Sequence, residues 1–167
     1  RFNGLNLCWE TLEGLVKHNG PPAAGAHEGD PAMLRALNDW PHRLDLELGQ
    51  HASAEAQVAA LADDIAWRTH DIDDGLRAGL ITMADLEDVA LITPILYLLE
   101  LRGSRDPSRD IYEIVRQLIT QLITDVVGES RRRMSALAPE TADDIRQAGR
   151  PVVWVSDDIS DDLTGLK

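Results

Sequence analysis

Apolar side chains recur at helical spacing along much of the chain, and this pattern predicts a series of helices. We expect the first helix over about residues 5–18, because Asn19-Gly20-Pro21-Pro22 combines a terminating glycine with a proline stop. A second helix is expected from about residue 54 to residue 73, with Ser53 at its N-cap and Gly75 beyond its end.

Two more long helices follow. The stretch of about 83–102 is apolar nearly all round, which predicts a central helix, and Pro94 should kink or interrupt it. The next helix should cover about 109–135, with Ser108 as its cap and an apolar core face.

Shorter elements complete the expected order. Residues 19–52 are rich in glycine and proline and predict a long loop after the first helix. A short fifth helix fits about 140–147, residues 152–155 read as extended, and Ser156 or Ser160 begins another helix. With about five helices and little strand signal, the predicted fold class is all-α.

The stretch 61–74 concentrates acidic side chains, a histidine and a tryptophan on a predicted helix. On helical geometry Asp63, Trp67 and Asp71, at i, i+4 and i+8, lie within about 80° of one another. One face therefore offers two acids beside a flat ring. The residues expected to form the buried face are Ala59, Ala62, Ile65 and Ala66.

This stretch and its flanks resemble the deoxyguanosinetriphosphate triphosphohydrolase family of the HD-domain superfamily. Members carry Ala-Asp-Asp-Ile-Ala-Tyr, matched here by residues 62–67, and an Asp-Ile-Asp-Asp-Gly-Leu-Arg-Ala-Gly-like run, matched by 71–79. A second block, 5–21, precedes them in the right order, so the resemblance covers most of 1–103 and, more loosely, the rest. It implies a helical HD-domain-type bundle, with 1–167 as part of one hydrolase domain.

The resemblance also implies a reaction, the metal-dependent hydrolysis of a deoxynucleoside triphosphate to deoxynucleoside and inorganic triphosphate. Asp63 matches the family's distal metal-binding aspartate, for a divalent ion such as Mg, Mn or Fe, and we expect its side chain to point inward. Trp67 stands where the family has tyrosine, so it can stack on a nucleotide but cannot accept a hydrogen bond. Asp71 matches an acid that faces the deoxyribose hydroxyl.

Three further residues are weaker candidates for a supporting role near the metal or the triphosphate: Asp64, His70 and Lys17. Their simpler interpretations are a solvated acid, a partly buried structural histidine, and a cation at a helix end. His70-Asp71 is not the family's His-Asp pair, because it follows the distal aspartate.

No stretch of this chain resembles the family's upstream blocks, which hold the first metal histidine, the His-Asp pair and the catalytic histidine. We therefore expect an internal portion of a longer enzyme, with no catalytic residue of its own and no activity in isolation. Two alternatives remain open: a helical oligomerisation or interaction element without catalysis, and an HD-type hydrolase of another phosphate ester. By resemblance, a homo-oligomer is expected.

The charge and hydrophobic content of the chain limit the classes of partner that it can have. A formal charge of −13 disfavours binding to nucleic acid, except as an effector, and no apolar run is long enough to cross a membrane. The single cysteine, Cys8, excludes an intrachain disulfide, and we expect a packed thiol in a helix and a cytoplasmic protein. At 167 residues and 44% hydrophobic content, the chain is long enough for one domain with a core.

Overall fold

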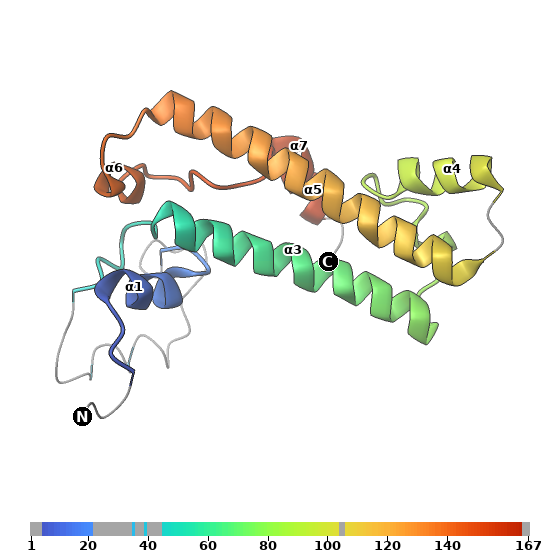
Figure 1. Cartoon of the computed structure of the whole chain (residues 1–167), viewed down its shortest axis with the longest axis horizontal. Helices are drawn as coiled ribbons and strands as arrows, with labels where there is room; N and C mark the ends of the chain where they lie inside the picture. Colours follow the sequence, from blue (N-terminus) through green and yellow to red (C-terminus); the bar gives the residue numbers. More distant parts are fainter. Residues whose placement is uncertain (1–4, 22–34, 36–38, 40–44, 104–105, 165–167) are drawn as a thin grey trace. The chain divides into compact units, whose positions relative to one another are not determined.

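The computed structural model describes residues 5–21, 35, 39, 45–103 and 106–164, and all regular structure in these ranges is helical (Figure 1). The all-α prediction is confirmed. None of the described helices has the length and apolar character needed to span a membrane. The helices are α1 (Trp9–Lys17), α3 (Ala54–Ala78), α4 (Thr93–Arg102), α5 (Pro107–Leu137), α6 (Ala142–Arg146) and α7 (Asp157–Thr164), with one short 3-10 helix, η1 (Ala84–Leu86).

The chain divides into two compact units. Unit 1 contains the described residues up to Leu61 together with Arg133–Val153, and unit 2 contains Ala62–Arg132 together with the described residues from Trp154 onward. Helix α3 contributes its first residues to unit 1 and the remainder, including the candidate acids, to unit 2.

Unit 1 is organised around side chains that join distant segments. Ser53 caps α3 by accepting a hydrogen bond from the Ala56 N–H at 3.3 Å, which confirms the predicted cap. One turn further on, the Gln57 Oε1 accepts the backbone N–H groups of Val152 and Val153 at 2.9 and 3.1 Å. The predicted extended stretch after α6 is thus fixed to α3 by a side-chain amide.

A buried cluster of charges also lies in unit 1. Glu13 on α1 is fully buried and accepts a hydrogen bond from Lys17 Nζ at 3.0 Å. Arg146 on α6 donates two hydrogen bonds to the same carboxylate, from Nε at 2.9 Å and from Nη2 at 3.1 Å. The Arg146 guanidinium also lies 4.9 Å from the centre of the Trp9 ring. Helices α1 and α6 are therefore tied together by one carboxylate and two cations.

Unit 2 has an aliphatic core. Its α3 segment contributes Ile65 and Ile72, and α5 contributes Ile114, Leu118 and Leu122 at helical spacing. The remaining buried apolar residues of this unit are Leu86, Leu91, Ile92, Ile95, Leu99, Ile111, Val155 and Ile159.

Helix α1 is shorter than predicted, because it begins at Trp9 and not near residue 5. Cys8 is its N-cap residue, in an extended conformation, and its exposed thiol lies 3.2 Å from the Thr11 hydroxyl. The prediction of a packed thiol inside a helix is therefore wrong. Leu5 is exposed as well, so the helical spacing before Trp9 has no core to cover, and spacing alone does not stabilise a helical turn. Most of the long loop predicted for residues 19–52 lies outside the described residues.

Helix α3 is longer than predicted and passes through Gly75. It ends where Gly79 adopts the left-handed conformation at φ 69°. The Leu80 N–H then donates to the Gly75 carbonyl at 2.9 Å, and the Gly79 N–H donates to the Leu76 carbonyl at 3.3 Å. These two bonds are those of a Schellman motif, so the second glycine, and not the first, is the stop.

The predicted helix of residues 83–102 is two elements. The 3-10 helix η1 lies near its start, and α4 begins only at Thr93, with Pro94 in its first turn. Pro94 thus interrupts the helix as anticipated, because proline fits the first turn, where its missing N–H removes no helical bond. The expectation of a central helix is wrong for one side of α4, where Tyr97 and Leu101 are exposed.

Helices α5 and α7 show how caps decide the boundaries. Asp106, and not Ser108, caps α5, because its Oδ1 accepts the N–H groups of Ser108 and Arg109 at 3.0 and 3.4 Å. Of the two predicted starts of α7, Ser156 and Ser160, the structure has Ser156 as the cap, and its hydroxyl accepts the Ile159 N–H at 3.4 Å. The short α6 carries a capping box between Thr141 and Asp144 and is narrower than the predicted 140–147.

Candidate functional site

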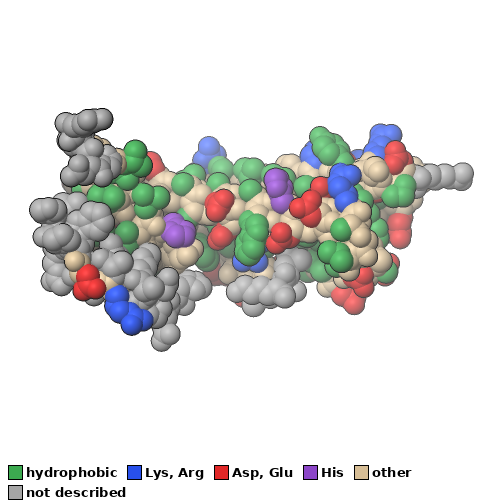
Figure 2. Space-filling model, turned by 90° about the horizontal axis from the view of Figure 1, so that it is seen from below, with side chains coloured by type: hydrophobic (Ala, Val, Ile, Leu, Met, Phe, Trp, Pro, Cys, Tyr) green, Lys and Arg blue, Asp and Glu red, His purple; other side chains and the backbone are tan. Residues whose placement is uncertain are grey.

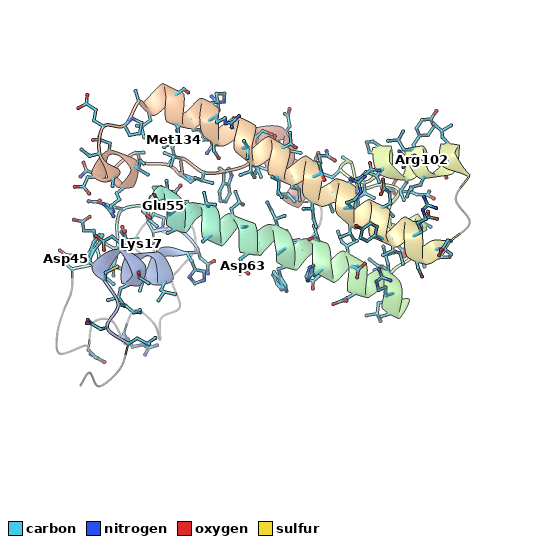
Figure 3. The ribbon with its side chains drawn as sticks, in the orientation of Figure 1. Lys17, Asp45, Glu55, Asp63, Arg102 and Met134 are labelled. Carbon is cyan, nitrogen blue, oxygen red and sulfur yellow. The ribbon has the colours of Figure 1, made fainter. Side chains whose placement is uncertain are left out.

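Asp63, Trp67 and Asp71 lie on α3 within unit 2, and all three side chains are exposed. Trp67 is 67% exposed, an unusual state for so large an apolar ring. Figure 2 shows acidic, histidine and hydrophobic side chains close together on one face of the molecule. In Figure 3 the labelled Asp63 projects outward from α3. The predicted grouping of two acids around an indole is therefore present on the surface of this helix.

The buried face of α3 is not the one predicted from its alanines. Leu61, Ile65, Thr69 and Ile72 are buried, whereas Ala59, Ala62 and Ala66 are exposed. Large aliphatic side chains gain more free energy from burial than alanine does, so they decide which face of the helix meets the core. The expectation that Asp63 points inward is accordingly wrong for this chain, although its metal-binding role stays a prediction.

The neighbouring candidates share the exposed surface. Asp64 and His70 are both exposed, so His70 is not the partly buried histidine of the simpler interpretation. Asp73, a turn further along, accepts a hydrogen bond from Arg77 Nε at 2.8 Å. This bond, reinforced by the Arg77 charge and by His70, lowers the pKa of Asp73. Asp73 is therefore held in its ionised form beside the candidate residues, and a negative charge attracts cations.

Lys17, a candidate for contact with a triphosphate, lies in unit 1, whereas Asp63 lies in unit 2. Its ammonium group is buried and donates to Glu13 at 3.0 Å and to the His51 carbonyl at 3.5 Å. An ammonium group held in this way is a structural partner of α6 through the shared carboxylate. Sequence reasoning did not find this role, because the Arg146 that completes the cluster lies 133 positions away from Glu13.

A metal site needs several ligands that converge on one point. Among them, no group of three or more His, Cys, Asp or Glu side chains converges in a way that could hold an ion. A metal site that included Asp63 would therefore need further ligands from outside the described residues. The donor type fits a hard divalent ion, but the donor set is incomplete.

Unit 2 also contains an open groove of about 680 Å³ that sequence analysis missed. Its lining combines apolar, cationic, acidic and uncharged polar side chains from α4, α5 and α7: Ile95, Leu98, Arg102, Arg116, Gln117, Thr120, Gln121, Thr124, Asp125 and Ile159. Glu113 engages both arginines, at 3.3 Å from Arg102 Nη1 and 2.8 Å from Arg116 Nη2. The hydrogen bonds from Arg116 and then Gln117 lower the pKa of Glu113 to about 2. One carboxylate therefore balances much of the cationic charge beside this groove.

Comparison with known proteins shows which proteins the chain is similar to. No protein-family model matches the chain. Over 99% of its length the chain is 47% identical to a deoxyguanosinetriphosphate triphosphohydrolase-like protein of Brucella anthropi, of which it covers 42%. It is 49% identical over 93% of its length to the protein of the same name from Brucella ovis, of which it covers 39%. The protein of that name from Caulobacter vibrioides is 46% identical over 99% of the chain, which covers 42% of it.

All three relatives carry the name of a hydrolase. The chain is therefore similar, over nearly its whole length, to one part of proteins named deoxyguanosinetriphosphate triphosphohydrolase-like. The chain spans about two fifths of the length of the curated relatives that it matches.

Proposed function

We propose that the protein containing this chain hydrolyses deoxynucleoside triphosphates to deoxynucleosides and inorganic triphosphate. The relatives' shared name supports the substrate class. The observation that carries the proposal is the placement of Asp63, Trp67 and Asp71 on one exposed face of α3. Such a face offers a carboxylate for a cation, a ring for a nucleotide and a second carboxylate for a hydroxyl group.

Asp63 is the metal-ligating residue of this proposal. A carboxylate suits Mg, Mn or Fe, and such an ion, when bound, supplies positive charge that polarises a phosphoryl oxygen. The remaining ligands would come from parts of the protein outside this chain. Because the described residues hold no complete ligand set, the chain by itself should be inactive.

Trp67 and Asp71 are the substrate-binding residues of the proposal. The indole ring presents a broad apolar face that can stack on a base or sugar, and its exposure leaves that face accessible. Asp71, one turn beyond it, can accept a hydrogen bond from a deoxyribose hydroxyl. A site that hydrogen-bonds a hydroxyl group discriminates against analogues that lack it, because its own polar group is then left unpaired.

A second candidate function, a helical interaction element, is supported by a different surface. Tyr97 and Leu101, one turn apart on α4, are 61% and 67% exposed. Exposed apolar side chains at helical spacing suit contact with another protein surface. This candidate predicts that Tyr97→Ser with Leu101→Ser changes the oligomeric state in solution, whereas substitutions on α3 do not.

The test of the enzymatic proposal compares Asp63→Asn with wild type in the complete protein. We expect the variant to lose bound divalent metal, measured by elemental analysis, and to lose hydrolysis of dGTP and the other deoxynucleoside triphosphates. Glu55→Gln, an exposed acid at the start of the same helix, is the matched control and should retain both. Retention of metal and activity by Asp63→Asn would overturn the assignment. A wild-type preference for simple phosphate esters over deoxynucleoside triphosphates would overturn the substrate class.

A further inference from the structure

A buried hydroxyl group sits in the middle of the candidate helix. Thr69 is 0% exposed and lies in the core face of α3. Its Oγ1 lies 2.8 Å from the Ile65 carbonyl oxygen and 3.0 Å from that of Ala66, so the hydroxyl donates into the preceding turn. Both carbonyl groups belong to the segment between Asp63 and Asp71.

Packing alone does not account for a threonine at this position. Its neighbours on the same face, Ile65 and Ile72, are buried aliphatic residues, and valine has nearly the same shape as threonine. Every other threonine whose side chain the structure describes is exposed. Burying a hydroxyl group in an apolar core gains less free energy than burying a methyl group. A polar function at this point of the helix is therefore the simpler reason for the presence of threonine.

The geometry of the helix places Thr69 opposite the candidate site. At about 100° per residue, its side chain is rotated by roughly 160–240° from those of Asp63, Trp67 and Asp71. A hydroxyl that bonds to carbonyl groups one turn back competes with the helix's own bonds and bends the helix. A curved helix is convex on the side where its carbonyl groups tilt outward and its backbone hydrogen bonds are longer. The Ile65 and Ala66 carbonyl groups that accept the Thr69 hydroxyl lie on the core side, so this bonding favours a bend whose concave side is the opposite, exposed face.

We propose that Thr69 is a positioning residue that curves α3 and thereby draws Asp63, Trp67 and Asp71 toward a common point. The inference rests on the proposed function, because it concerns how that site is shaped. It assigns the hydroxyl group of Thr69 no contact with substrate or metal. Its effect passes through the backbone of residues 65–69 to the exposed face.

The experiment uses Thr69→Val in the complete protein, which removes the hydroxyl group and keeps the shape. Thr69→Ser keeps the hydroxyl and loses a methyl group. Thr120→Val removes the same kind of bond from α5, where Thr120 Oγ1 donates to the Arg116 carbonyl at 2.8 Å, and serves as the matched control. Measured quantities are the KM and kcat for dGTP, the thermal midpoint, and the distance between the Cα atoms of residues 63 and 71 in crystal structures.

We expect Thr69→Val to unfold at the same temperature as wild type or higher, to lengthen the Cα distance, and to raise KM at least threefold with a smaller change in kcat. Thr69→Ser and Thr120→Val should stay within twofold of wild type. An unchanged Cα distance in Thr69→Val overturns the proposal, and so does a longer distance with unchanged KM. If wild type does not hydrolyse dGTP, the proposed function fails by itself, while the Cα distance still decides whether Thr69 shapes the helix. Should Thr69→Val fold poorly, a comparison of Thr69→Ala with Thr69→Ser isolates the hydroxyl group, because both variants lack the methyl group.

Discussion

Replacement of Glu13 by glutamine tests the energetics of unit 1. The carboxylate is fully buried and faces two cations, Lys17 at 3.0 Å and Arg146 at 2.9 and 3.1 Å. Glutamine keeps the shape and one acceptor oxygen but removes the charge. In Glu13→Gln both cations stay buried among the same neighbours. Among the described residues, Asp143 at 2.7 Å from Arg146 is then the carboxylate still paired with this cluster.

The expected loss follows from this imbalance. Breaking a buried ion pair by removing one partner costs about 3–5 kcal/mol, because the remaining charge has neither water nor a counter-ion. The retained acceptor of glutamine and the partly hydrated pair with Asp143 place Glu13→Gln near the lower end, at about 3 kcal/mol of unfolding free energy. Replacing all three charges together, as in Glu13→Leu with Lys17→Met and Arg146→Met, should recover most of this loss, since no buried charge is then unpaired.

Urea denaturation of the chain, combined with amide hydrogen exchange in α1 and α6, measures both effects where they arise. Asp73→Asn, which removes the exposed pair with Arg77, is the control and should change stability little, because exposed pairs are weak. A loss below about 1 kcal/mol for Glu13→Gln would refute the reasoning, since that is the value of an exposed pair. A triple apolar variant less stable than Glu13→Gln would show that shape, and not charge, dominates in this cluster.

Two other features give shorter tests. Gly128→Ala, at an open position inside α5, should stabilise the chain by about 0.5–1 kcal/mol, whereas Gly79→Ala, at φ 69°, should destabilise it by about 1–2 kcal/mol. Thermal denaturation measures both changes in stability. Equal effects of the two substitutions would contradict the argument from backbone conformation. NMR titration should show Glu113 ionising at a pKa of about 2, and Arg116→Gln should raise that pKa toward 4.5. The pKa of Glu113 is lower in the folded chain than in the unfolded chain. The stability that Glu113 contributes is therefore fully present above about pH 4.5 and is lost as the pH falls toward 2. An unchanged pKa of Glu113 in Arg116→Gln would contradict the assigned cause.

The helical class and several boundaries could be read from the sequence, because their causes are local. Ser53 and Ser156 cap the helices that follow them, as expected from the preference of serine for that position. Pro94 also interrupts its stretch as anticipated. Between Gly75 and Gly79, however, only the backbone conformation chooses the stop, and both residues fit the sequence rule equally well.

Long-range features could not be read in this way. The Glu13 and Arg146 cluster joins residues 133 positions apart, and the groove beside Glu113 takes its lining from three helices. Each of these residues looks like an ordinary surface charge on its own helix. The start of α1 was predicted too early for a related reason, because Leu5 and Cys8 continue the apolar spacing and yet both are exposed in the described structure.

At the candidate site, helical periodicity predicted which side chains share a face but not whether that face is buried. The spacing of Asp63, Trp67 and Asp71 correctly predicts one shared face, because the helical period is fixed by the backbone. It does not predict where that face points, because the small alanines near Asp63 fit either side of the helix. The aliphatic face made by Leu61, Ile65 and Ile72 settles the orientation, since its burial dominates the free energy. The carboxylates of Asp63 and Asp71, opposite that face, therefore remain in water, because burying an unpaired charge costs free energy. A cation or a cationic surface would compensate that cost, and the proposed metal site would supply such a cation.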